Sequence, residues 1–163
     1  MNFAHEPVLL QESIEALNLK PNGVYVDCTL GGAGHSLAIL ATEPTISLIG
    51  IDQDPAALER AQHRLQHHKE RVTLVHGNFR DIAQILAERG VEKVDGILMD
   101  IGVSSPQLDE GERGFSYHYD APLDMRMNPA NPVDARDLVN TLPEHELAQI
   151  IFEYGEERWA KRI

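Results

Sequence analysis

Apolar residues gather in four short runs within the first hundred positions of the chain, at residues 24–28, 46–51, 72–76 and 94–99. Each run is rich in Val, Ile and Leu and alternates little with polar residues. That pattern is typical of parallel strands that are covered on both faces. Amphipathic segments between and before the runs predict helices at about residues 8–17, 55–70 and 81–89. The alternation of short strands and helices predicts an α/β fold with a doubly wound parallel sheet.

Some of the predicted helix ends carry clear local signals. Asp54 is a natural N-cap residue, and Pro55 suits the first position of the helix that follows it. Asp81 is the expected cap of the next helix. Gly90 follows that helix at the position where a left-handed residue is favoured.

The character of the sequence changes after residue 100. Ser, Pro, Gly, Asp and Asn are frequent in residues 102–133, which predicts a loop region. Thr141 and Glu144 have the spacing of a capping box, so we expect a helix from there to about residue 152 and another that begins at Glu156. No further strand is predicted before Ile163, and no Gly or Pro ends the last helical stretch. We therefore expect this chain to be a piece of a longer protein.

The segment that follows the first apolar run, residues 27–36, reads Asp-Cys-Thr-Leu-Gly-Gly-Ala-Gly-His-Ser. It predicts a strand, a glycine turn and a helix, the arrangement that brings backbone amides against a nucleotide-like ligand. Glycine lacks the Cβ that would block a positive-φ turn and the close approach of the ligand. The spacing differs from G-x-G-x-x-G, and no G-x-x-x-x-G-K-[ST] follows. A turn with a preceding acidic residue and no lysine favours a ligand with little phosphate, such as S-adenosylmethionine.

Composition and charge restrict the function further. The 163 residues are 42% apolar and 25% charged, as expected of one soluble globular domain. No apolar run approaches the length of about 18 residues that a membrane span needs, and no signal-peptide pattern is visible, so we expect a cytoplasmic protein without membrane contact. The net charge of −12 disfavours strong nucleic-acid binding unless a basic surface is local or lies elsewhere. The single cysteine, Cys28, is expected to be a core thiol rather than a reactive one.

Candidate ligand contacts follow the second and third runs. Asp52 lies where a carboxylate can accept hydrogen bonds from both ribose hydroxyls of a ligand that crosses the strand ends. The alternative is that Asp52 only caps the next helix, a role that Asp54 fills more naturally. Phe79 follows the third run and could lie against a purine ring, with a plain core position as the alternative.

Another carboxylate, Asp100, ends the fourth run and faces the place where cofactor and substrate would meet. The lone pair of an aromatic amine is delocalised into the ring. A carboxylate that holds the amine hydrogens helps to turn that lone pair toward a methyl donor. Asp100 could instead hold the amino group of the cofactor, or bond only to amides of its own loop.

Other chemistries find little support in the sequence. The eight histidines include no pair with metal-ligand spacing beside a third ligand, and we expect no metal. His63, His67 and His68 lie on or near a polar helix face and are most simply solvated. No Ser/His/Asp set is legible, since Ser104 and Ser105 lack the glycines of a nucleophile elbow.

Several longer motifs together resemble one family closely. They are His-Glu-Pro-Val-Leu-Leu at 5–10, the glycine turn at 31–36, Asp-Ile-Gly-Val-Ser-Ser-Pro-Gln-Leu-Asp at 100–109, Arg-Gly-Phe-Ser at 113–116 with Pro-Leu-Asp-Met-Arg-Met at 122–127, and Tyr-Gly-Glu-Glu at 154–157 with Ala-Lys-Arg-Ile at 160–163. Over essentially its whole length the chain is similar to the bacterial 16S ribosomal RNA (cytosine-N4)-methyltransferases of the MraW or RsmH type, and it looks like their N-terminal part. The Ser-Ser-Pro-Gln and Asp-Met-Arg-Met segments are far more specific than the glycine turn.

The resemblance implies a Rossmann-like class I S-adenosylmethionine-dependent methyltransferase fold, with the first four parallel strands followed by a helical insertion and the sheet incomplete. On this interpretation residues 1–106 form the cofactor-binding core, and residues 107–163 begin the insertion that recognises the substrate. The implied reaction moves a methyl group from S-adenosylmethionine to the exocyclic N4 of a cytidine in the 16S ribosomal RNA of the small ribosomal subunit. The family holds its cofactor at positions that match Ala33, Gly34, His35, Asp52, Phe79, Asp100 and Gln107.

The resemblance alone adds Gln107 to the candidates, and Asp100 is the candidate catalytic residue. One departure leaves the acceptor of the amine hydrogens open. Many amine-directed methyltransferases carry (D/N/S)-P-P-(Y/F/W) after the fourth strand, whereas Ile-Gly-Val follows Asp100 here. Ser104, Ser105 and Asp109 therefore remain candidates beside it.

Two other functions stay open. A nicotinamide-dependent oxidoreductase could use the same kind of sheet, but the glycine spacing and the lack of a catalytic Tyr/Lys or Cys/His set disfavour it. The chain could also be a non-catalytic cofactor-binding module. In that case self-association as a homodimer would cover an exposed edge of the sheet.

Overall fold

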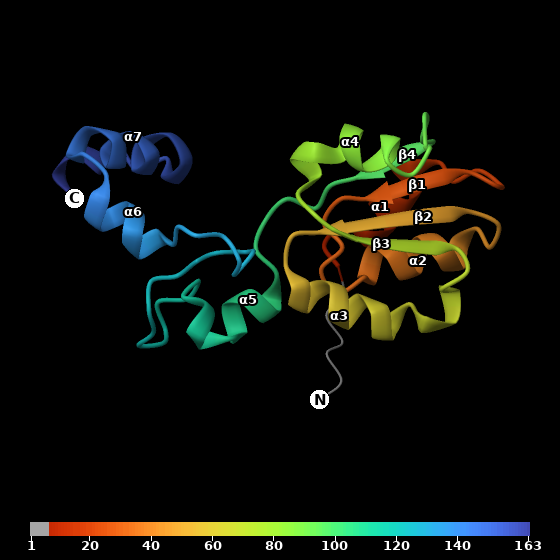
Figure 1. Ribbon diagram of the computed structural model, residues 1–163, viewed down its shortest axis with the longest axis horizontal. Coiled ribbons are helices and arrows are strands. Elements are labelled where there is room, and N and C mark those ends of the chain that lie inside the picture. The colour runs from red at the N-terminus through yellow and green to blue at the C-terminus, as the bar shows by residue number, and fades with distance from the viewer. Residues whose placement is uncertain (1–6) are drawn as a thin grey trace. The chain divides into compact units, whose positions relative to one another are not determined.

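A computed structural model describes residues 7–163 (Figure 1). The chain divides into two compact units, residues 1–102 and residues 103–163. The division predicted between residues 106 and 107 falls inside the short helix α5 (Ser105–Asp109) of the second unit.

The first unit contains a four-stranded sheet in which every strand pairs in parallel, in the order β3-β2-β1-β4. All four predicted strands and their α/β setting are confirmed. Its elements are α1 (Leu10–Leu17), β1 (Val24–Asp27), α2 (Gly34–Thr42), β2 (Ser47–Asp52), α3 (Pro55–Arg64), β3 (Val72–His76), α4 (Ile82–Ala87) and β4 (Gly96–Leu98).

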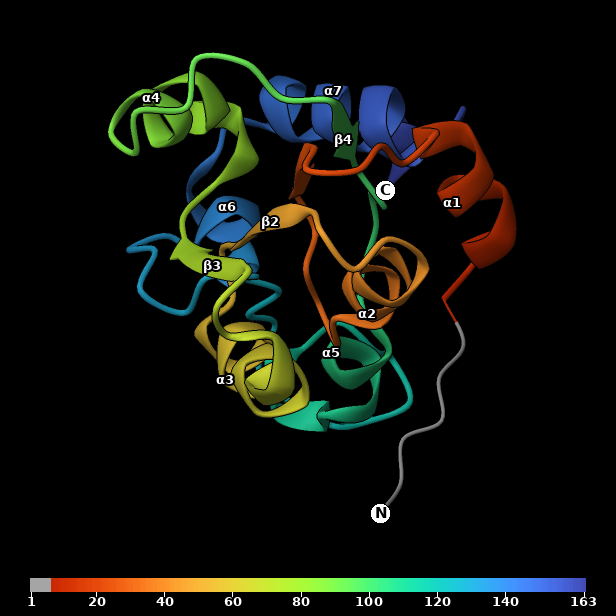
Figure 2. The same ribbon diagram turned by 90° about the vertical axis from the view of Figure 1, so that its right-hand side faces the viewer.

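Helices cover both faces of this sheet, which explains why the strands lack polar alternation (Figure 2). On one face, Tyr25 and Leu48 belong to a core cluster with residues of α1, α2 and α3. On the other face, Val26 and Ile49 belong to a second cluster, which includes Ile85 of α4. Burying one Leu or Ile side chain fully is worth about 2 kcal/mol, so these two layers supply most of the stability of the unit.

The helix ends of the first unit follow local chemistry. Asp54 caps α3 by accepting a hydrogen bond from the N–H of Ala56 at 3.0 Å, with Pro55 at the first helical position, as predicted. α3 ends at Arg64 and continues only as a 3-10 turn over Gln66–His68, so it is shorter than the predicted helix.

The fourth helix differs from the prediction at its start and agrees with it at its end. Asp81 makes no side-chain cap, and it is Asn78 that accepts from the N–H of Arg80 at 2.9 Å, before the 3-10 turn Phe79–Asp81. Gly90 has φ +67, and the N–H groups of Gly90 and Val91 bond back to α4. This is the left-handed helix end that the sequence predicts.

The second unit contains α5, α6 (Ala135–Thr141) and α7 (Glu144–Gly155). The capping box predicted at Thr141 is wrong, because Thr141 is the last residue of α6 and its hydroxyl donates to the carbonyl of Asp137. The helix predicted to begin at Glu156 is also absent from the residues described. That segment carries only a 3-10 turn over Ala160–Arg162.

A network of backbone contacts joins the Arg-Gly and Asp-Met-Arg-Met segments of the second unit. Arg113 donates from Nη2 to the carbonyls of Arg126 and Met127, both at 3.1 Å, and its own carbonyl accepts from the N–H of Met125 at 3.0 Å. Arg126 forms a bidentate pair with Asp124 at 2.9 and 2.6 Å. The hydrogen bonds from that guanidinium lower the pKa of Asp124 to about 2. These motif residues therefore hold the loop in shape.

Substitution of Gly114 tests how much this network contributes to stability. Its φ of +72 is unfavourable for other residues, and a Cβ there would meet the carbonyl of Pro122 and lie 2.7 Å from the backbone nitrogen of Asp124. We expect Gly114→Ala to lower the free energy of unfolding of the second unit by about 2 kcal/mol or more. Urea unfolding followed by the emission of Trp159, the one tryptophan of the chain, measures this.

Gly155→Ala is the matched control. Gly155 ends α7, and a Cβ there meets nothing within 4 Å. The same change should therefore leave stability unchanged or raise it slightly. Equal effects of the two substitutions would contradict the role assigned to Gly114.

Candidate functional site

Six of the seven predicted cofactor residues lie at or just beyond the carboxyl ends of the four strands, in the first unit. Because parallel strands end at the same edge of a sheet, these residues share that edge. Strand order reverses between β1 and β4, and open α/β sheets bind their ligands at such a point. The six are Ala33, Gly34 and His35 after β1, Asp52 at the end of β2, Phe79 after β3 and Asp100 after β4.

The glycine turn after β1 has the predicted left-handed backbone, but at Gly31 (φ +49) and at the fully buried Ala33 (φ +59). A non-glycine residue held in this conformation is a feature that clusters at ligand sites. Gly34 has a different reason to be glycine. A Cβ there would fall against the ring of Pro7.

Helix α2 begins at Gly34 with no side-chain cap from Ala33. The first N–H groups of a helix have no partner within the helix, which makes them candidate donors to a ligand. His35, in that first turn, is only 6% exposed. Its Nε2 is buried and has no hydrogen-bond partner in the part of the chain that the structure describes. A buried polar atom without a partner, next to a helix start without a side-chain cap, fits the binding of a polar small molecule here.

Asp27, the acidic residue that precedes the glycine turn, supports this part of the structure from below the surface. The side chain lies at the end of β1 and is buried, with Oδ2 accepting from the hydroxyl of Ser36 at 2.6 Å and Oδ1 from the N–H of Thr29 at 3.1 Å. Burial raises the pKa of Asp27 above its ordinary value, while the hydrogen bonds from Ser36 and Thr29 act in the opposite direction. The sequence marks this residue as a carboxylate at the end of an apolar run, but it does not reveal the bonds to Ser36 and Thr29.

Asp52 joins the turn after β1 to the start of α3. Its Oδ2 accepts from the N–H of Gly31 at 2.8 Å, and its Oδ1 accepts from the N–H of Asp54 at 2.9 Å. Burial raises the pKa of Asp52. Asp54 caps α3 as the sequence predicts, and Asp52 makes bonds to the turn and to the backbone of Asp54 that the sequence did not predict. Each carboxylate oxygen has a second lone pair, so contact with a ligand stays a prediction.

Asp100 presents its carboxylate to solvent, with 52% of the side chain exposed. Its backbone N–H donates to Oγ1 of Thr29 at 2.7 Å, which ties the loop after β4 to the loop after β1. Oδ2 of Asp100 lies 3.9 Å from Nδ1 of His35. The structure thus brings Asp100 and His35 together at the switch point and leaves the carboxylate open.

The remaining candidates have structural roles of their own. Phe79 is half-buried and packs against the core cluster that contains Val75 and Ile85. Part of its side chain therefore has the core role that the sequence offered as the alternative to contact with a purine. Gln107 is buried in the second unit and accepts from the N–H of Ser104 at 3.0 Å. Its role at the cofactor stays a prediction.

Cys28 is buried, and that burial, with the charge of Asp27 adding to it, raises the pKa of its thiol to about 11. The core interpretation of this cysteine is confirmed.

His63 and His67 are exposed as expected, whereas His68 is half-buried and contacts Arg71 at 3.0 Å through Nδ1.

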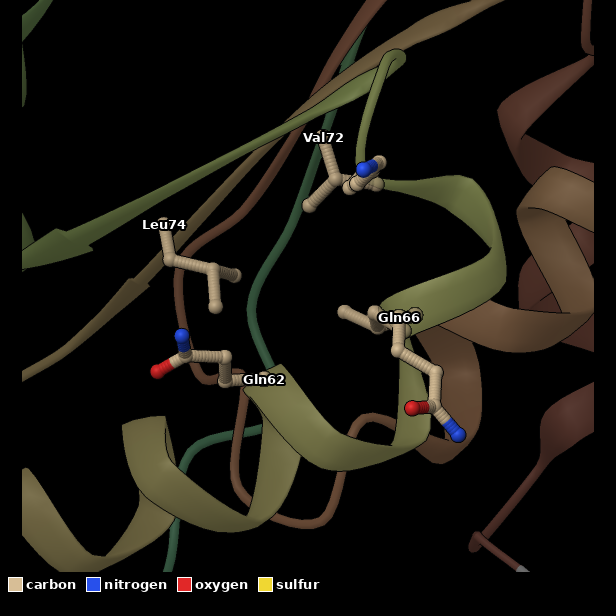
Figure 3. Close-up of a pocket in the computed structure, with 6 residues that line it drawn as sticks. Gln62, Gln66, Val72 and Leu74 are labelled. Carbon is tan, nitrogen blue, oxygen red and sulfur yellow. The ribbon is translucent and has the colours of Figure 1, made fainter.

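A cavity of about 430 Å³ lies apart from these residues, between α3 with the turn after it and β3 (Figure 3). Leu65, Val72 and Leu74 give it an apolar wall, and the amides of Gln62 and Gln66 lie at its rim. None of the predicted site residues lines it.

Within residues 7–163, no cluster of three or more His, Cys, Asp or Glu side chains could hold a metal ion. Across the same residues, no helix combines the length and hydropathy that crossing a membrane requires. The motif residues His5 and Glu6 lie outside the described residues.

The parallel strand order, the glycine turn and the residues gathered at the strand ends define a Rossmann-like sheet of the class I S-adenosylmethionine-dependent methyltransferases. A family model described as the MraW methylase family matches residues 2–163. The chain belongs to that family. Membership in a methylase family supports S-adenosylmethionine as the cofactor.

Curated relatives agree with this assignment. "Ribosomal RNA small subunit methyltransferase H" of Geobacter sulfurreducens is 61% identical over 100% of this chain and 53% of its own length. The protein of the same name from Symbiobacterium thermophilum is 57% identical, over 100% and 52%. This chain thus spans about half the length of these relatives. Among solved structures, the C-terminal domain of precorrin-6Y C5,15-methyltransferase from Rhodobacter capsulatus is 14% identical with a TM-score of 0.49, covering 68% of this chain and 57% of that one.

The raised pKa of Asp27 leads to a test of this buried carboxyl group. A raised pKa means that folding disfavours the ionised carboxylate. The resulting contribution to stability is complete below the ordinary value of 3.8 and is lost as pH rises through the raised value. Asp27→Asn keeps the shape and a hydrogen-bonding amide without the charge. We expect the variant to gain stability relative to the original protein as pH rises from about 3 to 7, measured by urea unfolding across that range. A difference in unfolding free energy between the two proteins that does not change with pH would contradict the raised pKa of Asp27.

Proposed function

We propose that the protein, as part of a longer enzyme, transfers a methyl group from S-adenosylmethionine to the exocyclic N4 of a cytidine in the 16S ribosomal RNA of the small ribosomal subunit. The observation that carries the proposal is the open carboxylate of Asp100 beside the turn at the switch point of the sheet. Relatives named ribosomal RNA small subunit methyltransferases support the RNA substrate. An enzyme for that substrate works in the cytoplasm, the compartment that the sequence predicts.

The residues along the strand ends are suited to hold the cofactor. S-adenosylmethionine supplies a methyl group on a sulfonium, which is a good leaving group. The amides at the start of α2, from Gly34 and His35, can donate to its polar groups. Asp52 has acceptor capacity left for ribose hydroxyls, and Phe79 offers an aromatic ring for the adenine. Gln107 joins this set through the family resemblance only.

Asp100 is the proposed catalytic residue because it combines exposure with a fixed backbone. Its carboxylate can accept the hydrogens of the cytosine amine and orient the nitrogen lone pair, so that positioning supplies much of the rate enhancement. The target cytidine must leave the base stack to reach such a site. Ser104, Ser105 and Asp109 remain alternative acceptors of the amine hydrogens.

Substitution of Asp100 in the full-length enzyme tests this role. We expect Asp100→Asn to lower methyl transfer to unmethylated small ribosomal subunits by about 100-fold, the usual range for a lost proton acceptor. The affinity for S-adenosylmethionine, measured by calorimetry, should change far less. Transfer of labelled methyl groups gives the rate.

Asp81→Asn is a suitable control, because its carboxylate is similarly exposed, at 48%, and follows β3 at the same end of the sheet. It should leave the rate within about twofold, the range expected for a surface substitution. Unaltered turnover in Asp100→Ala would remove Asp100 from the site. Binding of a nicotinamide cofactor without binding of S-adenosylmethionine would overturn the proposed function itself.

A further inference from the structure

The order of the strand ends assigns a part of the cofactor to each strand. The strands lie in the order β3-β2-β1-β4, with Phe79 after β3, Asp52 at the end of β2 and Asp100 after β4. On the proposed function, these residues lie at the adenine, at the ribose and at the site of methyl transfer. The sulfur of S-adenosylmethionine links the ribose side of the cofactor to the methyl group, which places it over the strand between β2 and β4. That strand is β1, and its last residue is Asp27.

The carboxyl group of Asp27 is buried at this position among neutral partners. The residue is only 1% exposed. Its Oδ1 accepts from the N–H of Thr29, and its Oδ2 accepts from the hydroxyl of Ser36. In the described part of the chain, no Lys or Arg side chain forms an ion pair with it. Burial among neutral groups disfavours the ionised form, which is the main reason that the pKa of Asp27 is raised.

The titratable groups around Asp27 do not supply a fixed positive charge. His35 of α2 favours the ionised form of Asp27, whereas the carboxyl group of Asp52 on β2 opposes it. Asp100 after β4 lies close to the imidazole of His35. Cys28, the next residue of the chain, stays a neutral thiol because burial raises its pKa to about 11. A cation bound over the end of β1 would add the positive charge that an ionised Asp27 lacks.

Methyl transfer changes the charge of the cofactor at this point. S-adenosylmethionine carries a positive sulfonium, whereas the product S-adenosylhomocysteine has a neutral thioether and otherwise keeps the same charged groups. A positive charge close to a carboxyl group lowers its pKa by about one to three units. Salt screens such an interaction only weakly when the carboxyl group is buried. The two ligands therefore differ in the property to which a buried carboxyl group responds.

We propose that Asp27 is a specificity-determining residue, which makes the protein bind S-adenosylmethionine more tightly than S-adenosylhomocysteine. The proposal rests on the proposed function, from which it takes the placement of the cofactor. Asp27 ionises when the sulfonium binds, and its proton passes to solvent. After methyl transfer the sulfur is neutral, and Asp27 takes up a proton from solvent again. The product then lacks the attraction that held the cofactor, which favours its release.

Proton release measures this response. Calorimetry of the full-length enzyme, in two buffers of different ionisation enthalpy, gives the number of protons released on binding. We expect S-adenosylmethionine to release more protons than S-adenosylhomocysteine. The affinity for S-adenosylmethionine, divided by that for S-adenosylhomocysteine, should rise about tenfold from about pH 5 to about pH 8, the change that a pKa lowered by about one unit produces. The ratio rises with pH because binding at low pH must first remove the proton of Asp27.

Three variants identify the group that responds. Asp27→Asn should abolish both the extra proton release and the rise of the affinity ratio, since an amide does not titrate. Ser36→Ala removes a hydrogen bond that lowers the pKa of Asp27, so the ratio should rise at a higher pH in this variant. Asp81→Asn is the matched control, because it removes an exposed carboxylate that follows β3 at the same end of the sheet. It should leave the ratio and its dependence on pH unchanged.

The outcomes separate this proposal from the proposed function. Equal proton release with both ligands, or a ratio that does not change with pH, would refute the role of Asp27 and leave the methyltransferase function standing. A pH dependence that persists in Asp27→Asn would refute it too, because an imidazole such as that of His35 would then be the responding group. An enzyme that distinguishes the ligands as expected but transfers no methyl group to small ribosomal subunits would support the proposal and contradict the function. Binding of neither ligand would contradict both.

Discussion

The buried carboxylate of Asp27 fixes the geometry on which the candidate site depends. It bonds to Ser36 in the first turn of α2 and to the backbone of Thr29, so it joins the end of the central strand β1 to the glycine turn and to the helix beyond it. Thr29 in turn holds the backbone of Asp100 at the end of β4. A carboxyl group is costly to bury, and here it organises the strand ends on both sides of the switch point.

The sheet could be predicted from sequence because a parallel strand buried on both faces needs a continuous apolar run, and four such runs are present. Helix ends were less predictable where a competing hydrogen bond decides them. Asn78 takes the capping role expected of Asp81, and the hydroxyl of Thr141 bonds back into α6 instead of opening α7. Among the candidate site residues, Asp52 could be placed at the end of a strand from its position in the sequence. Its bond to Gly31 could not be predicted, because it depends on the register between β1 and β2, which no local pattern reveals.

The motifs that identify the family most specifically do structural work in the second unit. Arg113 and the Asp124–Arg126 pair hold two loop segments together through backbone carbonyls. A motif of this kind is specific because several backbone groups must be satisfied at once, which few other sequences achieve. Recognition of the family therefore came from residues that shape a loop, whereas the chemistry is assigned to less distinctive carboxylates at the strand ends.

Asp52 gives the candidate site a further property. Its two oxygens bridge the turn after β1 and the start of α3, so a ligand that bonds to the same carboxylate draws on the acceptors that keep these loops in place. If the ligand bonds to the lone pairs that the backbone leaves free, we expect its binding and the order of the two loops to be thermodynamically coupled through this one carboxylate. On the proposed contact between Asp52 and the cofactor, a substitution in either loop that shifts this carboxylate would weaken cofactor binding without touching the cofactor.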